Sequence, residues 1–471
     1  MEHKDHIHLI GIGGSGQSAI ARILLEMGYT VSGSDRTANQ LTQSLQKSGA
    51  QIFIGHAAEQ ITGANLVIRS SAIPDDNPEV LAAGAAGIPV YKRSQFLGKL
   101  LEKKATLAIA GTHGKTTTTA MLAWMLVQLE KDPSYIIGGV SLNLRTNAHA
   151  GKGDYFVIEA DEYDYMFLGL NPDLAVVTYM EHDHPNCFPT MREYRQAFID
   201  FVKNLKPGGV LLVAKDQPET LNLVQHVPPG CKAYTFGAPP VGNYTASNLT
   251  PNRQGGFSFN ASFRTNGSST APLARVDLQV PGEHNVRNAL AALAAIHQLG
   301  EDVPRAAKAL GEFKGTGRRF EIKGEWNGII LIDDYAHHPT EISATLAAAR
   351  SRYPLRRIWA VWQPHTYTRT MVLLPEFAQS FTIADRVIVT EIYGARENNT
   401  AFSSSEVVRQ MSHPAALFLP EIDQVVKFLC ENLQTGDVVL VLSAGDADQI
   451  NQKILACWQA KKGNHEQSAS N

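Results

Sequence analysis

The sequence predicts an α/β protein with mainly parallel sheets, divided into about three domains. Strand-like apolar runs alternate with helical stretches along almost the whole chain. Two of these strands lead into glycine-rich turns that are followed by helices, an order typical of nucleotide-binding folds. With 471 residues, the chain is long enough for about three domains that each bury a core.

The composition is that of an ordinary globular protein and argues against several classes of protein. Hydrophobic residues make up 44% of the chain and charged residues 18%. A formal net charge of −3 argues against nucleic acid as a partner. No apolar run approaches the roughly 18 residues of a membrane-spanning helix, and the polar start does not resemble a signal peptide, so we expect no membrane insertion. No CxxC pair occurs among Cys187, Cys231, Cys430 and Cys457, so we expect reduced thiols and a cytoplasmic location.

Charge and composition also predict the domain boundaries. The charged stretch Glu102–Lys104 marks the expected end of the first domain. We therefore expect domains at residues 1–104, 105–314 and 315–471, with the polar tail 461–471 disordered. Residues 241–271 are rich in Asn, Ser, Thr and Gly, and form an expected insertion. Apolar and polar residues alternate from Phe257 to Phe263, which predicts an antiparallel hairpin.

The first glycine-rich loop follows a strand at His6–Ile10 and precedes a helical stretch. A second strand ends at Asp35, roughly 20 residues after the loop, where an acid can meet a ribose hydroxyl. This is the pattern of a dinucleotide-type loop. Two other interpretations stay open: a Rossmann-like loop without a ligand, and binding of NAD. The loop residues are Gly11, Gly13, Gly14, Ser15 and Gly16.

The second glycine-rich loop follows the strand Leu107–Ala110 and has the pattern of a compressed phosphate loop. Its glycines allow backbone N–H groups to approach phosphate oxygens, and Lys115 neutralises phosphate charge. The hydroxyl of Thr116 is placed to reach Mg²⁺. The alternative is a glycine-rich turn with a chance Lys-Thr pair. The loop and the start of its helix comprise Gly111, Thr112, His113, Gly114, Lys115, Thr116 and Thr117.

Acidic residues and histidines follow two further strands. The strand Tyr155–Glu159 continues into Asp161 and Glu162, an oxygen-rich end that favours Mg²⁺ binding over a solvated acidic turn. The strand beginning at Leu174 ends in Glu181, His182, Asp183 and His184. This second cluster is compatible with a ligand of a second metal, a residue that orients metal-bound water, or a zinc site.

Polar residues at later strand ends extend the pattern. Asn285 lies at a helix start, where it either caps the helix or contacts a ligand. Arg319 either clamps a phosphate or belongs to a basic surface turn. Asp333–Glu341 and Gln363–Arg369 each close a strand, although Thr340 and Glu341 also fit a helix cap. Two phosphate-type loops on separate domains indicate two phosphorylated molecules held at once, which favours a multidomain ligase and a site between domains.

Together these motifs resemble those of the Mur ligase family, in the family's order and over essentially the whole chain. The matching segments are Gly111–Thr118, Glu159–Glu162, Asp183–His184, His284–Ala292, Arg318–Phe320 and Asp333–Glu341. The resemblance implies a Rossmann-like N-terminal domain, a central P-loop ATPase domain and a Rossmann-like C-terminal domain. It also implies an ATP- and Mg²⁺-dependent ligase of peptidoglycan precursor synthesis. This enzyme joins L-alanine to the carboxylate of UDP-N-acetylmuramate through an acyl phosphate, as a monomer or homodimer.

The resemblance assigns a role to each matching residue. The residues assigned to catalysis are Lys115, Glu159, His184 and Arg319. The residues assigned to Mg²⁺ binding are Thr116, Glu159 and His184. The ATP phosphates are assigned to the phosphate loop and Arg319. The adenine is assigned to Asn285 and Asn288, and the ribose to Asp334. The UDP-sugar site comprises Gly11, Gly13, Gly14, Ser15, Gly16, Asp35, His56, Ser70 and Ser71. The amino-acid side comprises His338 and Arg369.

Three residues depart from the pattern of the L-alanine ligases. Tyr163 stands where Ser is usual and is reminiscent of ligases that recycle murein tripeptide. Asn186 replaces an Asp, and Thr366 replaces a common Arg. These changes concern the amine substrate, so two alternatives stay open: a tripeptide-recycling ligase acting on the same nucleotide sugar, and a nucleotide-binding homologue without catalysis.

Overall fold

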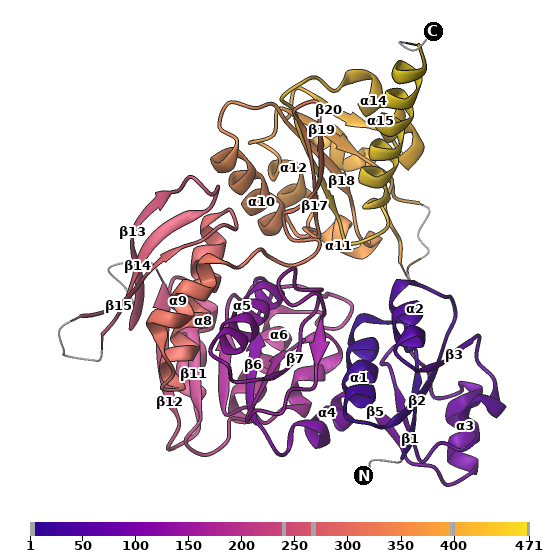
Figure 1. Cartoon of the computed structure of the whole chain (residues 1–471), viewed down its shortest axis with the longest axis vertical. Coiled ribbons are helices and arrows are strands. Elements are labelled where there is room, and N and C mark those ends of the chain that lie inside the picture. The colour runs from indigo at the N-terminus through magenta and orange to yellow at the C-terminus, as the bar shows by residue number, and fades with distance from the viewer. Residues whose placement is uncertain (1–4, 238–241, 265–269, 396, 398–400, 469–471) are drawn as a thin grey trace. The chain divides into compact units, whose positions relative to one another are not determined.

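A computed structural model describes residues 5–237, 242–264, 270–395, 397 and 401–468 (Figure 1). The chain divides into two compact units. Unit 1 comprises Met1–Leu249, Phe259–Asp277 and Arg287–Lys314, and unit 2 comprises Thr250–Ser258, Leu278–Val286 and Gly315–Asn471. Val241 and residues 265–269 of the predicted insertion lie outside the described residues, as do residues 469–471 of the predicted tail.

The first sheet belongs to unit 1 and is wholly parallel, with strand order β3-β2-β1-β4-β5 (Figure 1). Its strands are β1 (His6–Ile10), β2 (Thr30–Asp35), β3 (Gln51–Ile54), β4 (Leu66–Arg69) and β5 (Val90–Lys92). Its helices are α1 (Ser15–Glu26), α2 (Gln40–Lys47), the 3₁₀ turn η1 (Ala58–Ile61), α3 (Pro78–Ala85) and α4 (Arg93–Leu101). The order reverses beside β1, so the loop after β1 opens where such sheets bind ligands.

The two faces of this sheet carry different side chains. Ile7 and Leu9 point to the face where apolar residues of α1 and α4 are buried. Ile10 belongs to a smaller apolar cluster that includes Ala83 of α3. Because side chains alternate along a strand, His8 shares the α3 face with Ile10. That face is therefore partly polar beneath α3.

The second sheet has the order β15-β14-β13-β12-β11-β10-β6-β9-β7-β8. Its strands are β6 (Ala105–Ala110), β7 (Ser134–Ile136), β8 (Ala148–His149), β9 (Tyr155–Glu159), β10 (Leu174–Val177), β11 (Val210–Ala214), β12 (Lys232–Gly237), β13 (Tyr244–Pro251), β14 (Phe257–Phe263) and β15 (Ala271–Asp277). Its helices are α5 (Lys115–Gln128), η2 (Tyr163–Gly169), α6 (Met191–Lys203), α7 (Pro218–Asn222), η3 (Leu223–His226), α8 (Glu283–Gln298) and α9 (Val303–Gly311). Strand β6 pairs in parallel with both β9 and β10, so the carboxyl ends of these three strands meet at one edge.

The alternating stretch of the predicted insertion forms β14, which neighbours β13 and β15 in the sheet. A tight turn precedes β14, with Asn252 N donating to Gly256 O over 3.0 Å. The side chains of Thr245 on β13 and Ser262 on β14 hydrogen-bond at 2.8 Å. The insertion therefore contains the hairpin that the alternation predicts.

The third sheet belongs to unit 2, with the order β16-β17-β21-β18-β19-β20 and an antiparallel edge strand β16. Its strands are β16 (Glu321–Trp326), β17 (Ile329–Asp334), β18 (Ile358–Gln363), β19 (Arg386–Val389), β20 (Ala416–Phe418) and β21 (Val438–Ser443). Its helices are α10 (Pro339–Arg352), α11 (Tyr367–Val372), α12 (Leu374–Gln379), α13 (Ser405–Gln410), α14 (Ile422–Asn432) and α15 (Gln449–Ser468). Apolar clusters cover both faces of this sheet.

The α/β fold class with mostly parallel sheets is confirmed. Helix α15 continues through the polar residues up to Ser468, where composition predicts a disordered tail from residue 461. Buried Ile450 and Ile454 anchor the first turns of this helix to the sheet. Within the described residues, no helix has the length and apolar character needed to cross a membrane.

Candidate active site

The phosphate-type loop, residues 111–114, connects β6 to α5 at the carboxyl edge of the second sheet. Gly111 and Gly114 have φ angles of 128° and 82°, which favour glycine. A Cβ atom on Gly111 would lie 2.4 Å from Thr178 Oγ1, and one on Gly114 would lie 2.4 Å from Asn288 Oδ1. The loop is therefore built for close backbone approach, as its sequence predicts, and Asn288 lies directly against it.

Lys115 begins α5 and is surrounded by oxygen atoms. Its Nζ donates to Gly111 O at 2.6 Å and to the two carboxylate oxygens of Glu162 at 2.8 and 3.1 Å. Burial by itself lowers the pKa of Lys115, but the carboxylates of Glu162, Asp161 and Glu159 outweigh burial and raise this pKa. Lys115 is thus a fixed cation bonded to oxygen acceptors. Phosphate oxygens are acceptors of the same kind.

Thr116 and Glu159 come together as the sequence predicts. Thr116 Oγ1 donates to Glu159 Oε1 at 3.0 Å, and the other carboxylate oxygen accepts from Gly138 N at 2.6 Å. Burial raises the pKa of Glu159, against the opposing effects of Lys115 and of the hydrogen bonds from Gly138 and Thr116. A hydroxyl and a half-buried carboxylate side by side form an oxygen donor set of the kind that Mg²⁺ prefers. These residues therefore fit the ion.

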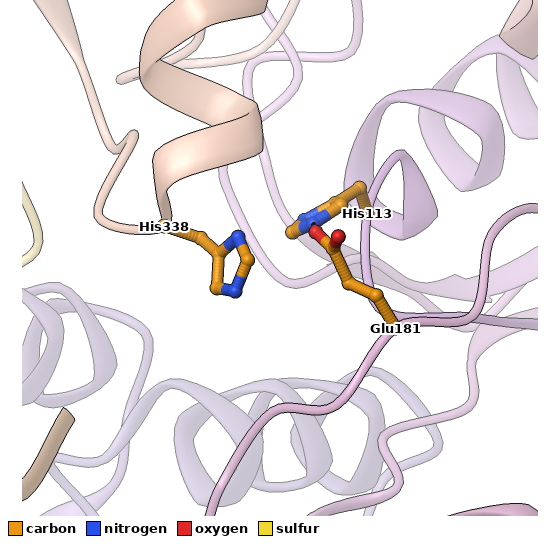
Figure 2. Close-up of side chains that lie close together, drawn as sticks. All are labelled: His113, Glu181 and His338. Atoms are coloured by element: carbon orange, nitrogen blue, oxygen red, sulfur yellow. Dashed lines mark hydrogen bonds and ion pairs between the residues drawn. The ribbon is translucent and has the colours of Figure 1, made fainter. Parts of the chain in front are cut away.

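The segment after β10 packs against the loop. Thr112 N donates to Tyr179 O at 2.8 Å, and Glu181 N donates to Thr112 Oγ1 at 3.0 Å. Figure 2 shows the His113 ring against the Glu181 carboxylate, with which it forms a hydrogen bond. Glu181 thereby fixes the side chain of a phosphate-loop residue.

His184 lies on the same side, near acidic groups. Its Nε2 is 3.8 Å from Glu162 Oε1 and 3.6 Å from Asp183 Oδ2. Its ring also contacts the ring of Tyr163 edge-on, with centroids 5.1 Å apart. Tyr163 OH accepts from Asn186 Nδ2 at 3.2 Å, so two of the residues that depart from the L-alanine ligase pattern contact each other beside His184.

The first glycine-rich loop is held by the predicted acid. Gly13 N donates to Asp35 Oδ2 at 2.8 Å, and Asn39 Nδ2 donates to Gly13 O at 3.0 Å. A Cβ atom on Gly11 would lie 3.1 Å from Ser70 Cβ. The structure thus gathers the loop, Asp35 and Ser70 at one edge of the first sheet. The helix after the loop begins at Ser15, with Gly14 as its N-cap, and Ser71 follows Ser70 on the surface.

Arg93 connects the surroundings of the two loops within unit 1. It begins α4, and its guanidinium occupies the space where a Cβ atom of Gly16 would lie. Its Nη2 is 3.5 Å from Asp161 Oδ2, in the acidic segment after β9. Gly16 thus leaves room for the Arg93 side chain beside the first loop.

The predicted residues of α8 fall in its first two turns. Helix α8 begins at Glu283, so Asn285 lies inside it and is not the N-cap. Its Nδ2 donates to Pro281 O at 2.7 Å, whereas an N-cap side chain would accept from a backbone N–H. The capping alternative is therefore wrong for Asn285. Asn288, one turn later, is the residue against Gly114.

The remaining predicted residues lie in unit 2. Asp334 ends β17 and accepts from Phe320 N at 2.7 Å and Ala336 N at 2.8 Å, and burial raises its pKa to about 6. Arg319 Nη1 is 3.6 Å from Glu341 Oε1. His338, at the start of α10 in Figure 2, is that helix's N-cap and accepts from Thr340 N at 3.4 Å, so the cap is His338 and not Thr340 or Glu341.

Arg369 lies in α11, after the carboxyl end of β18. It is buried, and its Nη1 is 3.2 Å from His365 Nδ1. The preceding Thr366 has a φ of 65°, which is rare for a β-branched residue and reorients the chain into α11.

One residue at the site, Tyr194, was not singled out by the sequence, and the partners of two of the predicted acidic residues were not predicted. Glu162 pairs with Lys115, Glu181 with His113, and Tyr194 OH hydrogen-bonds Thr112 Oγ1 at 2.7 Å. Glu162 and Glu181 belong to the acidic strand ends, so their position was a usable signal. Tyr194 lies within an amphipathic helix, and its spacing is that of a core residue.

Comparison with known proteins now decides the family. Models of the Mur ligase family match the chain in three consecutive parts. These are the family's catalytic domain over residues 6–105, the middle domain over residues 109–296 and the glutamate ligase domain over residues 318–445. The chain belongs to the Mur ligase family. The resemblance drawn from the sequence motifs is confirmed.

Individual Mur ligases resemble the chain over nearly its full length. The UDP-N-acetylmuramate–L-alanine ligase of Caldanaerobacter subterraneus subsp. tengcongensis is 40% identical, with 97% of this chain and 98% of the relative covered. The crystal structure of the UDP-N-acetylmuramate–alanine ligase of Thermotoga maritima matches with a TM-score of 0.81 at 31% identity, covering 97% and 99%. That of a murein peptide ligase from Psychrobacter arcticus matches with a TM-score of 0.71 at 28% identity, covering 96% and 98%. These matches confirm the three-domain α/β architecture.

Proposed function

We propose that this Mur ligase joins L-alanine to the carboxylate of UDP-N-acetylmuramate at the expense of ATP, in peptidoglycan precursor synthesis. The observation that carries the proposal is the cluster of Lys115, Thr116 and Glu159 at the carboxyl edge of β6 and β9. These residues supply a cation and metal-type oxygen ligands beside a glycine loop. The choice of L-alanine is supported by the 40% identical ligase over 97% of the chain.

The proposal divides the work among three domains. Residues 1–104 hold the UDP-sugar through the first loop with Asp35, His56, Ser70 and Ser71. Residues 105–314 hold ATP through the phosphate loop and Asn288, and residues 315–471 hold the amino acid through His338 and Arg369. Asn285, Arg319 and Asp334 complete the nucleotide site in this assignment. We further propose a cytoplasmic monomer or homodimer, with which the absence of a disulfide among the four described cysteines is consistent.

The chemistry follows from where charge develops. A carboxylate is a poor electrophile, so the substrate carboxylate first takes the γ-phosphoryl group of ATP, which releases ADP and forms an acyl phosphate. The neutral amine of L-alanine then attacks the acyl carbon, phosphate leaves, and the nitrogen loses a proton to give the amide. Both steps increase negative charge on oxygen atoms. Lys115 exchanges its bonds to Glu162 and Gly111 O for bonds to phosphate oxygens, and Arg319 is assigned to the same charge.

Thr116 and Glu159 would hold Mg²⁺, with His184 at a second ion. When bound, Mg²⁺ neutralises phosphate charge and acts as a Lewis acid. Gly138 N, which donates to Glu159, orients the carboxylate toward Thr116. Glu162 keeps Lys115 in place at the start of α5, so the cation is positioned before the nucleotide arrives.

A second candidate is the tripeptide-recycling reaction on the same nucleotide sugar. The contact between Tyr163 and Asn186 beside His184 favours it, because both residues depart from the L-alanine ligase pattern. The murein peptide ligase of Psychrobacter arcticus also matches the chain over 96% of its length. In this reaction the amine donor is a peptide and the phosphate chemistry is unchanged.

The deciding experiment measures phosphate release from ATP and Mg²⁺ with UDP-N-acetylmuramate and one amine at a time. The amines are L-alanine, glycine, L-serine and L-Ala-γ-D-Glu-diaminopimelate, and the amide product is identified by mass. We expect turnover with L-alanine. Turnover with the tripeptide alone would establish the second candidate, and no turnover with any amine would leave a nucleotide-binding protein without catalysis.

A further inference from the structure

A chain of hydrogen bonds runs through the first domain beneath α3. His6 Nε2 and His8 Nδ1 each lie 2.7 Å from Ser32 Oγ, and His8 Nε2 lies 2.6 Å from Glu79 Oε2. The other oxygen of Glu79 lies 2.6 Å from His56 Nδ1. Fully buried Glu79 thus bridges a strand histidine and His56, which is assigned to the UDP-sugar site.

The sheet geometry explains why these groups meet. His6 and His8 lie two residues apart on β1, as Ser32 and Ser34 do on the neighbouring β2. Residues two apart on a strand share one face, so all four side chains face α3. Glu79 lies in the first turn of α3, whose N-cap Asn77 accepts from Glu79 N at 2.9 Å. His56 lies between β3 and η1. Residues from three segments therefore converge on a carboxylate that a fourth segment, α3, supplies.

The directions of these hydrogen bonds follow from the charge of Glu79. Burial by itself raises the pKa of this carboxyl, but hydrogen bonds from His8, Ser34 and His56 lower it overall. An ionised carboxylate only accepts hydrogen bonds, so His8 Nε2, Ser34 Oγ and His56 Nδ1 all donate to it. A neutral His56 with its proton on Nδ1 has an unprotonated Nε2.

We propose that Glu79 is a positioning residue that fixes His56 as the Nδ1–H tautomer, so that His56 Nε2 accepts a hydrogen bond from an N–H or O–H group of the uridine part of the substrate. Among the residues that the structure describes, none is bonded to His56 Nε2, and the side chain is 15% exposed. The diphosphate has only acceptor oxygens, whereas uracil N3–H and the ribose hydroxyls are donors. His56 Nε2 therefore suits a donor group of the ligand, such as uracil N3–H or a ribose hydroxyl, and not the phosphates.

This inference rests on the proposed function in taking a UDP-sugar as the ligand of the first loop. The first test needs no ligand. Protein labelled with ¹⁵N-histidine is examined at pH 7.5 by long-range nitrogen–proton correlation, and the signal missing from His56→Gln identifies His56. We expect the Nδ1–H tautomer. An Nε2–H tautomer or a doubly protonated ring would overturn the proposal.

The second test measures UDP binding by calorimetry in Glu79→Gln, with ADP binding to the same protein as the measure of folding. Glutamine has the same shape but presents an N–H group as well as a carbonyl, so it does not enforce one His56 tautomer. We expect UDP affinity to fall at least about tenfold, or roughly 1.4 kcal/mol, with ADP affinity unchanged. Exposed Glu59 lies in the same domain, and Glu59→Gln is the matched control, expected to bind UDP as the unsubstituted protein does.

Each outcome of the second test bears on the proposal. UDP affinity within twofold of the unsubstituted protein would overturn it, as would failure of that protein to bind UDP. If Glu79→Gln loses ADP binding as well, the tautomer of the unsubstituted protein decides. None of these measurements uses turnover, so failure of the ligase assay with intact UDP binding counts against the proposed function alone.

Discussion

The two glycine-rich loops of unit 1 have the same local form, but the charged side chains beside them differ. Each follows a parallel strand and opens a helix, at Ser15 in the first and at Lys115 in the second. The first is held by Asp35, which accepts from Gly13 N, and has a hydrogen-bonded histidine network nearby. The second places the Lys115 cation beside the buried carboxylate of Glu162 and near the carboxylates of Asp161 and Glu159. A βα turn therefore supplies the frame, and the residues around it determine which ligand it suits.

The comparison extends to two glutamates, fully buried Glu79 and half-buried Glu159. Donors surround Glu79 and lower its pKa, whereas burial raises the pKa of Glu159. The first carboxylate is satisfied by the protein and orients a neighbour. The carboxylate of Glu159 is costly to ionise in the protein alone. A bound cation would therefore stabilise its charged form strongly. The difference supports a structural role for Glu79 and a metal-binding role for Glu159.

The largest expected effect comes from Lys115→Ala. Loss of a charged contact to developing oxyanions should lower kcat about 10²- to 10³-fold, as measured by phosphate release. UDP affinity should be unchanged, because Lys115 belongs to the second loop. Exposed Lys203 on α6 gives the control Lys203→Ala, which should keep full activity. A Lys115→Ala enzyme with a turnover close to that of the control would remove the phosphate role from this residue.

Glu159→Gln tests the metal role of the second loop. Replacing a charged ligand with an amide should raise the Mg²⁺ concentration for half-maximal rate at least about tenfold, or ~1.4 kcal/mol. Glu102→Gln, at an exposed carboxylate of the same unit, should leave the Mg²⁺ dependence unchanged. An unaltered Mg²⁺ titration in Glu159→Gln would mean that this carboxylate does not bind the ion.

Alanine substitutions in the loops should separate the two ligands. Gly114→Ala introduces a side chain at a φ of 82° and 2.4 Å from Asn288 Oδ1. The left-handed conformation costs a residue with a side chain about 1–2 kcal/mol. This strain favours a different loop conformation from the one that would hold phosphate, so ADP affinity should fall roughly tenfold with UDP affinity retained. Gly13→Ala places its Cβ 2.9 Å from Asp35 Oδ2 and should do the reverse.

The control for the loop substitutions is Gly84→Ala in α3, where the new methyl group meets no atom within 4 Å. Alanine favours a helix, so this variant should be at least as stable as the unsubstituted protein. If Gly114→Ala and Gly13→Ala weaken both nucleotides equally, the loops do not serve separate ligands.

The last prediction concerns the pH dependence of stability at Glu79. Its pKa is lowered in the folded state, so its hydrogen bonds stabilise the protein above the unfolded pKa, and this contribution is lost as pH falls through the folded pKa. Glu79→Gln should therefore lower the free energy of unfolding by about 1–3 kcal/mol at pH 7. The difference should shrink below pH 4.5. Denaturant titration at several pH values measures it, and a difference that grows on acidification would contradict the assigned charge.

Much of the site was predictable because local order along the chain carries it. A strand, a glycine turn and a helix occur in sequence around Lys115, and Glu159 ends the next parallel strand. The carboxyl ends of neighbouring parallel strands must meet at one edge, so the proximity of Thr116 and Glu159 follows once β6 and β9 pair. The N-cap interpretation of Asn285 failed because helix starts are fixed only to within a residue or two by sequence signals.

The sequence by itself determined the α/β class, the two loops, the family motifs and the residue types at the strand ends, because these depend on neighbours along the chain. Only the tertiary structure decided that Glu162 holds Lys115, that Asp35 accepts from Gly13 N, and that Glu79 joins His8 to His56. The physical reason is that the partners of a buried charge are set by the packing of distant segments. His8 and Glu79 lie 71 positions apart, and their contact exists only once α3 covers the sheet.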